Sequence, residues 1–453
     1  MHDGNPLAYL ALALFFPLAF AVTKRRRPSI AATGLFVGAI LFLPEMQLVK
    51  LPAIPAWSKT TIPAFATLLA LRVNQPQRFR VVFTSRWPKL FLLLTLVCAI
   101  GTTVTNMDPV VWGRKVCEGL KITDINFLFL SDTLGFYLPF VLGCVAIRSE
   151  SELVDLFAMV IALCLVYSLP ILVELRLSPQ MNNWIYGFAQ HEFGQTVRDG
   201  GYRPMVFMAH GLALGLFVAA AALAATTFRK VGLSAFRFDT KWVFPFLVAI
   251  LVLVKSKGAL LFGLVLVPLI LFTSPRTQVR AAALMAVLVL AYPWLRTYEV
   301  IRREPTVELA RSFFGEERSK SLEFRLLNEE VLIERTMQHV YFGWGHYDRA
   351  DVYPADDTRA LTTRDGGWII VLGERGVTYW VVFFGTLVIP VFAAWRSIDR
   401  IRSERARWLV AGLSLMTAMY ALDLLPNGLF NTLGVYFAGA LYGVLPRLAS
   451  SRA

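Results

Sequence analysis

Long apolar runs recur along the whole chain of 453 residues, and they constrain its fold more than any other feature. They are about 16–25 residues long, the length that a helix needs to cross roughly 30 Å of hydrocarbon. With 56% hydrophobic residues, the chain is far richer in apolar side chains than a soluble globule needs for its core. We therefore predict an all-α polytopic membrane protein with about 12–13 transmembrane helices.

The apolar runs and the loop signals between them place these helices. The expected segments are residues 6–23, 28–44, 61–73, 88–106, 126–147, 153–175, 205–228, 242–254, 258–273, 281–295, 367–395, 408–425 and 429–446. The third is short enough to be a re-entrant or surface piece. The first run is followed, not preceded, by its basic cluster Lys24 to Arg27, which is the reverse of a cleavable signal peptide.

The basic loops indicate the orientation. If the N-terminus lies outside, every strong basic loop falls on one side, as retention of Lys and Arg in the cytoplasm requires. These loops are 24–27, 72–89, 229–241, 276–280 and 396–407, joined by the C-terminal arginines 447 and 452. We expect a multi-pass protein of the bacterial inner membrane with a cytoplasmic C-terminus. The net charge of +14 is explained by these clusters, so nucleic acid is not an expected partner.

One long polar segment, residues 296–366, interrupts the apolar pattern. It divides the chain into an N-terminal transmembrane bundle (1–295), a large and partly helical periplasmic loop (296–366) and a C-terminal bundle (367–453). An enzyme working on the outer side meets no ATP or nucleotide sugar, so its substrates must arrive already activated, for example on a lipid. The four cysteines show no disulfide or metal-ligand spacing, and we expect neither a metal nor a cofactor.

Two candidates lie at the end of the outer loop 176–204. Arg203 belongs to the motif Asp199-Gly-Gly-Tyr-Arg203-Pro and precedes a helix expected to start at Met205. It can bind a lipid phosphate or serve as a snorkelling anchor. His210 is expected one or two turns inside that helix, where a histidine is either functional or a hydrogen-bonded packing residue.

The turn at Lys255-Ser-Lys257 places two ammonium groups on the outer side, against the positive-inside tendency. An anionic ligand such as a diphosphate would compensate them, whereas the alternative is a turn whose lysines reach water. Further on, residues 323–339 have apolar side chains near helical spacing, at Phe324, Leu327, Val331 and Met337. We expect a helix lying on the bundle and headed by Arg325, although its polar face can equally be a solvated surface.

The last candidates stand where the polar segment returns to the membrane. They are His346, in Gly343-Trp-Gly-His346, and Arg364 with Asp365, just before the Gly373-Glu-Arg-Gly376 motif. Asp365 can act as a general base toward an acceptor hydroxyl if neighbouring cations and burial tune it. The alternative is that Asp365 caps the following helix.

In this order, these motifs resemble the O-antigen ligase and polymerase family of bacterial membrane glycosyltransferases. The stretch from Arg203 to Ala213 matches the arginine before that family's Gly-x-Phe-x-x-Pro-Asn helix start. Lys255 to Ala259 matches its Ser-x-Ser-Arg-Gly-Ala turn. The helix with Arg325 that runs into Gly343-Trp-Gly345, and the Asp365 to Gly376 stretch, match its remaining motifs. The resemblance covers about residues 200–380 and implies a bundle similar to those of GT-C glycosyltransferases.

The resemblance implies glycan transfer from an undecaprenyl-diphosphate donor to a glycan or lipid acceptor, without metal or nucleotide. Arg203, Arg325 and Asp365 would be catalytic; Lys255, Lys257, Arg364, His210 and His346 would bind the diphosphate or substrate. Two departures stand out: His210-Gly211 replaces the family's Pro-Asn, and Asp365 replaces the ligase histidine. An aspartate there favours a polymerase or another exopolysaccharide transferase over lipid A-core ligation.

Two other classes of function compete with this interpretation. A transporter or lipid flippase would also use cations for a lipid diphosphate, but we see no internal repeat. Its coupling ion would need a carboxylate in mid-membrane, and the best candidate, Asp423, lies near the outer end of its segment. A non-catalytic scaffold of an envelope export complex is the third possibility. Convergence of Arg203, Lys257, Arg325 and Asp365 on one cavity would favour the enzyme.

Overall fold

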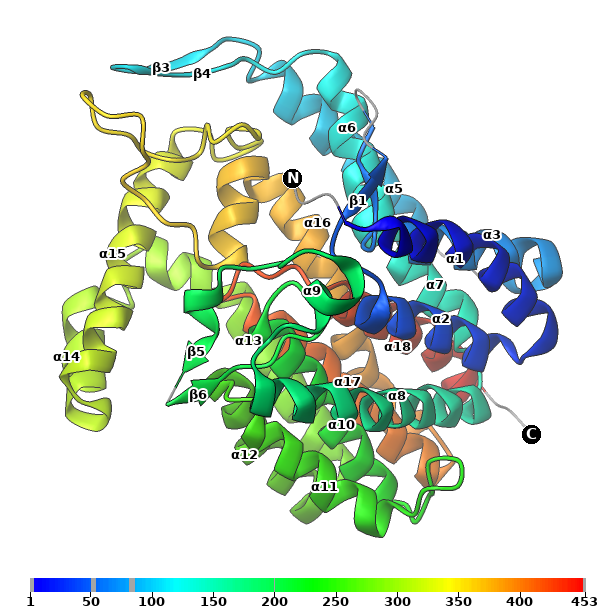
Figure 1. The fold of residues 1–453 in the computed structure, drawn as a ribbon. Helices are drawn as coiled ribbons and strands as arrows, with labels where there is room; N and C mark the ends of the chain where they lie inside the picture. Colours follow the sequence, from blue (N-terminus) through cyan, green and yellow to red (C-terminus); the bar gives the residue numbers. More distant parts are fainter. Residues whose placement is uncertain (1–3, 50–53, 81–85, 199, 451–453) are drawn as a thin grey trace.

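Most of the structure is helical, as the apolar runs predict (Figure 1). The computed structural model describes residues 4–49, 54–80, 86–198 and 200–450; Asp199, which begins one of the motifs above, lies outside them. The elements up to residue 202 are α1 (Pro6–Arg25), α2 (Pro28–Phe42), β1 (Gln47–Val49), β2 (Trp57–Ser58), α3 (Ile62–Asn74), η1 (Pro76–Phe79), α5 (Arg86–Val104), β3 (Val110–Trp112), β4 (Lys115–Cys117), α6 (Thr123–Asp132), η2 (Thr133–Tyr137), α7 (Leu138–Ala146), α8 (Glu150–Leu177), α9 (Met181–Tyr186), η3 (Phe193–Thr196), β5 (Val197–Arg198) and β6 (Gly201–Tyr202). The rest are α10 (Gly211–Lys230), α11 (Thr240–Leu253), α12 (Lys257–Phe272), α13 (Pro275–Thr297), α14 (Arg303–Phe314), α15 (Glu316–Met337), α16 (Gly367–Ser397), η4 (Ile398–Arg400), α17 (Glu404–Asp423) and α18 (Thr432–Ser450).

Seven helical runs among the described residues are long and apolar enough to cross a membrane. They are α1, α5, the run from α6 through η2 to α7, α8, α10, α13 and α16 with η4. Four shorter apolar helices, α2, α3, α11 and α12, accompany them. A mostly helical fold with several helices that could cross a membrane is therefore confirmed, and it fits the predicted multi-pass membrane protein. Each predicted segment contains a helix, but the count of 12–13 spans and the orientation stay predictions.

The outer helices carry apolar side chains on their exposed faces, which is what contact with lipid requires. In α1, a stripe of leucines at helical spacing is about half exposed, while the opposite face, including Leu12 and Phe15, is buried against the bundle. The exposed leucines are Leu7, Leu10, Leu14 and Leu18. A contiguous apolar surface of this kind is unfavourable in water but not in hydrocarbon.

Small residues allow the central helices to approach closely. α10 is buried along almost its whole length and packs against α8, α11, α12 and α17. α7 and α18 cross at glycines: a Cβ added at Gly439 would collide with the backbone of Phe140. Such contacts replace the hydrophobic effect as the main source of helix association in a membrane.

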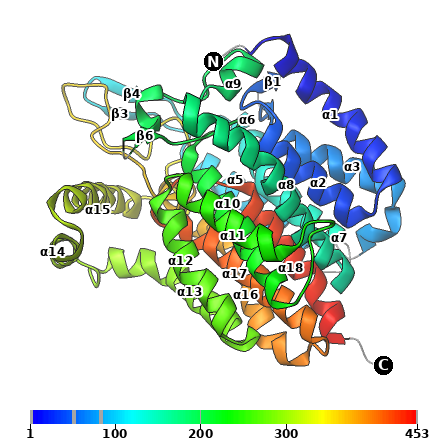
Figure 2. The same ribbon diagram turned by 60° about the horizontal axis from the view of Figure 1, so that its bottom comes forward.

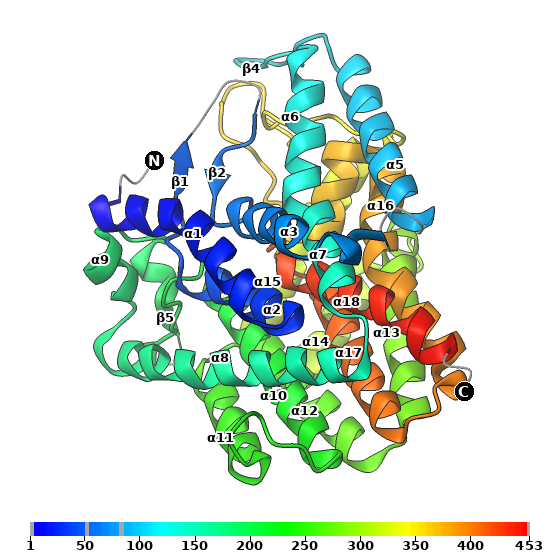
Figure 3. The ribbon, with the colours of Figure 1, turned by 90° about the vertical axis from the view of Figure 1, so that its right-hand side faces the viewer.

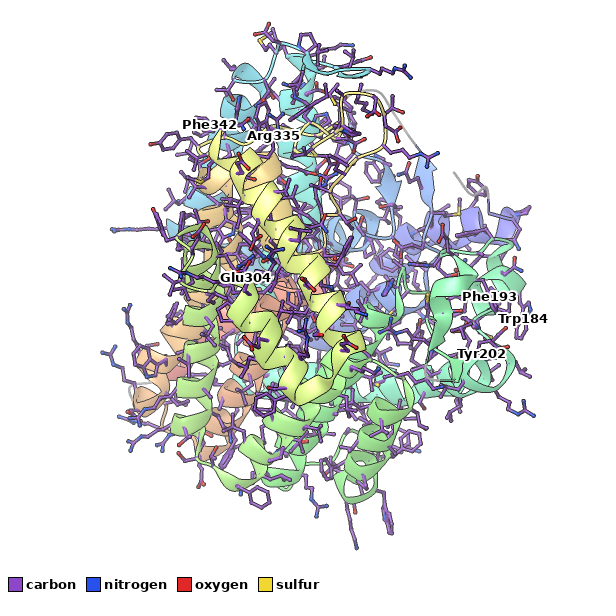
Figure 4. The ribbon with its side chains drawn as sticks, turned by 90° about the vertical axis from the view of Figure 1, so that its left-hand side faces the viewer. Trp184, Phe193, Tyr202, Glu304, Arg335 and Phe342 are labelled. Atoms are coloured by element: carbon purple, nitrogen blue, oxygen red, sulfur yellow. The ribbon has the colours of Figure 1, made fainter. Side chains whose placement is uncertain are left out.

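The polar segment forms a helical hairpin at one side of the bundle (Figure 2). Figure 4 shows α14 beside α15, with Glu304 on α14 and Arg335 toward the upper end of α15. The expected apolar face of α15 was wrong, because Phe324, Leu327 and Met337 are 44–53% exposed. The buried face is mixed, and it consists of Ser319, Leu326, Asn328, Glu329, Leu332, Arg335 and Thr336. Arg325 does not head the helix, because α15 begins at Glu316 after Gly315, whose φ is +81°.

The two glycine motifs that follow the hairpin contact each other. α16 is kinked at Gly376, where φ is +70°, and the kink leaves backbone groups without helical partners. The 340–345 segment supplies them: the amides of Trp344 and Gly345 donate to the carbonyls of Gly373 and Glu374, each at 2.8 Å. In return, the amide of Val377 donates to Val340 at 2.8 Å. The spaced glycines thus dock the end of the polar segment onto a membrane helix.

A hairpin of β3 and β4 lies beyond the tops of α5 and α6 (Figures 1 and 3). Arg349 ties it to the loop after α15. Its guanidinium, 2% exposed, donates to the carbonyls of Trp344 (2.9 Å), Asp108 (2.9 Å) and Glu118 (2.7 Å). This one side chain therefore fixes two loops far apart in the sequence.

Candidate functional site

A cavity of about 690 Å³ collects the candidate residues from distant parts of the chain. It lies between the 203–212 segment, the α11–α12 turn, α15, the residues before α16 and the 426–429 loop. All of the candidates except His346 line it: Arg203, His210, Lys255, Lys257, Arg325, Arg364 and Asp365. Arg203, Lys257, Arg325 and Asp365 therefore converge on one cavity, the arrangement expected to favour an enzyme.

Arg203 is held at the cavity wall by a rigid turn. The carboxylate of Glu174, on α8, accepts the amides of Met205 and Val206 at 2.8 Å each and that of Met181 at 3.0 Å. Val206 has a φ of +57°, which β-branched residues adopt only under strong constraint. The helix therefore begins at Gly211 and not at Met205, because Glu174 uses the amides that a helix start would present.

The prediction that His210 lies inside the helix is wrong, because His210 is the N-cap residue of α10. Its Nδ1 accepts the amide of Leu212 at 3.0 Å, which satisfies one of the unpaired donors at the start of α10. The next residue, Gly211, makes room for Arg203: an added Cβ would lie 2.6 Å from the Cδ of that arginine. The pair His210-Gly211, which stands where the resembled family has Pro-Asn, therefore lets the aliphatic part of Arg203 pack against the first turn of α10.

The two lysines come from the expected tight turn between α11 and α12. Lys255 has a φ of +51°, and Lys257 is the first residue of α12. Glycines bring this turn to the Arg203 loop: a Cβ at Gly201 would collide with the ammonium of Lys255, and one at Gly215 would collide with Ser256. Arg203, Lys255 and Lys257 therefore form one basic wall.

Arg325 and Asp365 form the opposite wall. The Nε of Arg325 lies 3.5 Å from Oδ2 of Asp365, and its Nη1 donates to the carbonyl of Pro426 at 3.4 Å. Their side chains are 41% and 37% exposed, so both reach the cavity. Asp365 does not cap α16, because Gly366 occupies the N-cap position. The carboxylate is therefore available to a ligand.

Arg364 is engaged by acidic partners. Its guanidinium lies 2.9 Å from Asp351, 2.5 Å from Glu374 and 3.5 Å from Asp348. Three carboxylates satisfy its charge, so Arg364 anchors the loop before α16 and adds little positive potential to the cavity. Burial raises the pKa of the Asp351 carboxyl, and Arg364 opposes this shift.

His346 lies apart from the other candidates, in a different cavity. It faces Asp124, at the start of α6, with Nε2 3.7 Å from Oδ1. It stays apart because the neighbouring Trp344 and Gly345 pair with the kink of α16. The structure thus separates one predicted substrate ligand from the basic wall.

The ends of three helices add to the positive potential of the main cavity. α10, α12 and α16 all begin at its wall, at Gly211, Lys257 and Gly367. A helix N-terminus carries roughly half a positive charge and unpaired amides, so it favours anions. Among the described lining residues, Asp365 is the one carboxylate, and it stands against Arg203, Arg325, the two lysines and these helix ends. The cavity is therefore suited to a polyvalent anion.

A smaller cavity of about 210 Å³ adjoins the Arg325–Asp365 pair. Both residues and Pro426 line it as well as the main cavity. Most of its other side chains are apolar: Leu322, Leu326, Leu332, Ile369 and Leu425. At its inner end Glu329 lies 3.0 Å from Arg296 and accepts from Tyr292 at 3.0 Å. An apolar slot therefore lies beside the charged site.

Several residues of the site were missed in the sequence. Ser321 and Asn427 line the cavity but are ordinary polar residues without a local signal. Glu174 had a signal, because it is a carboxylate within an apolar run, and such residues are costly to bury unless they serve a purpose. Asp124, which lines the separate cavity around His346, could not be recognised either, because its partner Tyr347 is 223 positions away.

No protein-family profile and no curated protein matches this chain.

Proposed function

We propose that this protein is a membrane glycosyltransferase that moves a glycan from a lipid-diphosphate donor, such as an undecaprenyl-diphosphate-linked saccharide, to a sugar hydroxyl. The observation that carries the proposal is the meeting of Arg203, Lys255, Lys257 and Arg325 with Asp365 around one cavity. The O-antigen ligase and polymerase resemblance agrees with it. The orientation predicted from the basic loops supports a reaction on the outer face of the inner membrane.

The basic wall suits the leaving group. A departing diphosphate gains negative charge as its bond to the sugar breaks, and fixed cations aimed at that charge lower the barrier. Arginine can bind two phosphate oxygens at once, which a lysine cannot do, so Arg203 and Arg325 would hold the diphosphate in register. The apolar slot beside Arg325 gives the first isoprene units of the donor a surface to pack against.

Asp365 would act on the acceptor. Its carboxylate would take the proton of the acceptor hydroxyl while the hydroxyl oxygen bonds to the anomeric carbon. The bond between that carbon and the diphosphate oxygen breaks at the same time, and the electron pair leaves with the lipid diphosphate. Attack from the side opposite the leaving group inverts the anomeric configuration. Neither redox chemistry nor a nucleotide is needed for this balance.

The test uses Arg325→Ala and Arg325→Lys, with Arg359→Ala, an exposed arginine of the same loop, as the matched control. Right-side-out vesicles receive a purified undecaprenyl-diphosphate oligosaccharide, and the glycan products are sized. We expect Arg325→Ala to slow glycan lengthening roughly 100-fold, as loss of one preorganised donor does elsewhere. Arg325→Lys should restore only part of the rate, because it cannot bind in a bidentate manner.

The same experiment separates the rival functions. A flippase would change the side of the membrane on which the oligosaccharide is found without changing its length. A scaffold would show neither effect in vesicles of purified protein. Unchanged glycan lengthening in Arg325→Ala would overturn the proposal.

A further inference from the structure

A second large cavity, of about 760 Å³, lies around His346. Its wall is made by α6, the β1–β2 hairpin, the 346–347 segment and the start of α18. Its volume falls within the roughly 300–1,000 Å³ typical of small-molecule sites. The polar groups at its wall include Lys121, Thr123, Asp124 and Ser131. The proposed transfer step uses none of them.

His346 and Asp124 are arranged to receive a hydroxyl group. Among the described residues, neither ring nitrogen of His346 has a hydrogen-bond partner, although both atoms are buried. Such groups are rarely left unsatisfied. Its Nε2 lies 3.7 Å from Oδ1 of Asp124, too far for a direct hydrogen bond, and the hydroxyl of Tyr347 is 3.4 Å from the same oxygen. One ligand hydroxyl can donate to Asp124 and bond to the imidazole together.

The backbone that presents these side chains is strained. Tyr347 and Asp348 are consecutive non-glycine residues with φ of +64° and +59°. A positive φ is unfavourable for a residue with a side chain, so it persists only where the surroundings impose it. Here the docking of Trp344 and Gly345 onto α16 fixes the chain on one side, and Arg349 fixes it on the other. With this strained backbone, both His346 and Tyr347 line the cavity.

The chemistry of the wall fits a saccharide better than a second diphosphate. Besides His346, Lys121 is the one cationic side chain among the described lining residues, and Asp124 opposes it. Aromatic rings stand beside the polar groups: Phe127 lies 5.5 Å and Tyr347 3.8 Å from the imidazole, centroid to centroid. Sugars offer hydroxyls that both donate and accept, and C–H faces that pack on rings.

The two large cavities are linked by the loop between α17 and α18. Gly428 and Leu429 line the basic cavity, and Phe430 and Thr432 line the His346 cavity. A small cavity of about 210 Å³, lined by Gly428 to Thr432, lies between them. We infer that the His346 cavity binds the saccharide chain that extends from the reaction centre, with Asp124 and His346 as hydroxyl ligands. This inference rests on the proposed function.

The test measures two bindings on the purified full-length protein in nanodiscs. The probes are undecaprenyl diphosphate, for the basic cavity, and oligosaccharides cut by mild acid from the surface polysaccharide of the strain that carries the gene. We expect His346→Ala and Asp124→Asn to weaken oligosaccharide binding about tenfold, the effect of one or two lost hydrogen bonds. Undecaprenyl diphosphate should bind the variants as it binds the wild type, which also checks their folding.

Tyr347→Phe provides a milder variant, because the side chain is 52% exposed and loses only a hydroxyl. It should weaken oligosaccharide binding roughly threefold, while Tyr341→Phe, 68% exposed and outside the cavity, should not. Oligosaccharide binding that is equal in all variants, or absent in a wild type that binds undecaprenyl diphosphate, overturns the inference alone. Binding of neither probe overturns the proposed function as well.

Discussion

The Nε of Arg325, in the middle of α15, lies 3.5 Å from the carboxylate of Asp365, two residues before α16. This pair joins the polar hairpin to the membrane bundle at a place where two cavities meet. Both side chains are partly exposed, so their attraction is screened and adds little to stability. A weak pair of this kind can open when an anion competes for the arginine, which would release the carboxylate for an acceptor.

Asp365→Asn should abolish most of the activity and leave the fold intact. The amide cannot take a proton, so glycan transfer should fall roughly 10²–10⁴-fold, the usual contribution of a general base. The melting temperature should stay near the wild-type value, because the side chain is 37% exposed and does not cap α16. Initial rates in vesicles measure the first quantity. Asp356→Asn, at an exposed position of the same loop, is the control. A rate close to that of the control would rule out Asp365 as the base.

Glu174→Gln should act on Arg203 at a distance. The carboxylate accepts three amides, and the NH₂ group of glutamine would face one or more of them. The turn that carries Arg203 should therefore shift, and binding of undecaprenyl diphosphate should weaken about tenfold, or about 1.4 kcal/mol. Glu308→Gln, on the exposed face of α14, is the matched control. A lower melting temperature with unchanged diphosphate affinity would limit Glu174 to a structural role.

Gly376→Ala should destabilise the kinked part of α16. Its φ is +70°, and an added Cβ would collide with the backbone of Tyr341 and Phe342. Gly232→Ala is an informative control, because Gly232 has a φ of +68° and no atom within 4 Å of an added Cβ. The control should cost only the backbone strain, about 1–3 kcal/mol. Gly376→Ala should lower the melting temperature clearly further. Equal effects of the two substitutions would show that the close approach is unimportant.

The sequence predicted the helices well because the apolar runs are long and the bilayer fixes their length. It predicted the boundaries less well where a distant residue decides them. Only the position of Glu174 explains why α10 starts at Gly211 and not after Pro204. The buried face of α15 was also missed, because Glu329 and Arg335 are satisfied by partners on other segments. Periodicity cannot reveal such partners.

For the site, too, the sequence predicted part of the arrangement and missed the part that depends on distant residues. The sequence left open whether Arg203, Lys257, Arg325 and Asp365 converge, and the structure brings them, with Lys255, to one cavity. Motif order alone could not show this, because Arg325 lies in the middle of α15 and not at the end of an apolar run. It placed His346 among them, since Gly343-Trp-Gly-His346 is close to Asp365 in the chain. The separation depends on the kink at Gly376, which captures the residues just before His346.

The pH dependence of folding should reveal the environment of His346. Burial lowers the pKa of its imidazole below the ordinary 6.5, with Arg375 and Arg349 acting in the same direction and Asp124 against it. The unfolded chain therefore binds a proton near pH 6.5 that the folded protein resists, so this residue destabilises the fold as the pH falls below 6.5. The melting temperature of the wild type should drop more between pH 7.5 and 5.5 than that of His346→Gln, whose side chain does not titrate. All other titrating groups are common to both proteins and cancel in the comparison. Equal drops in the two proteins would mean that the imidazole is as accessible to protons in the folded chain as in the unfolded one.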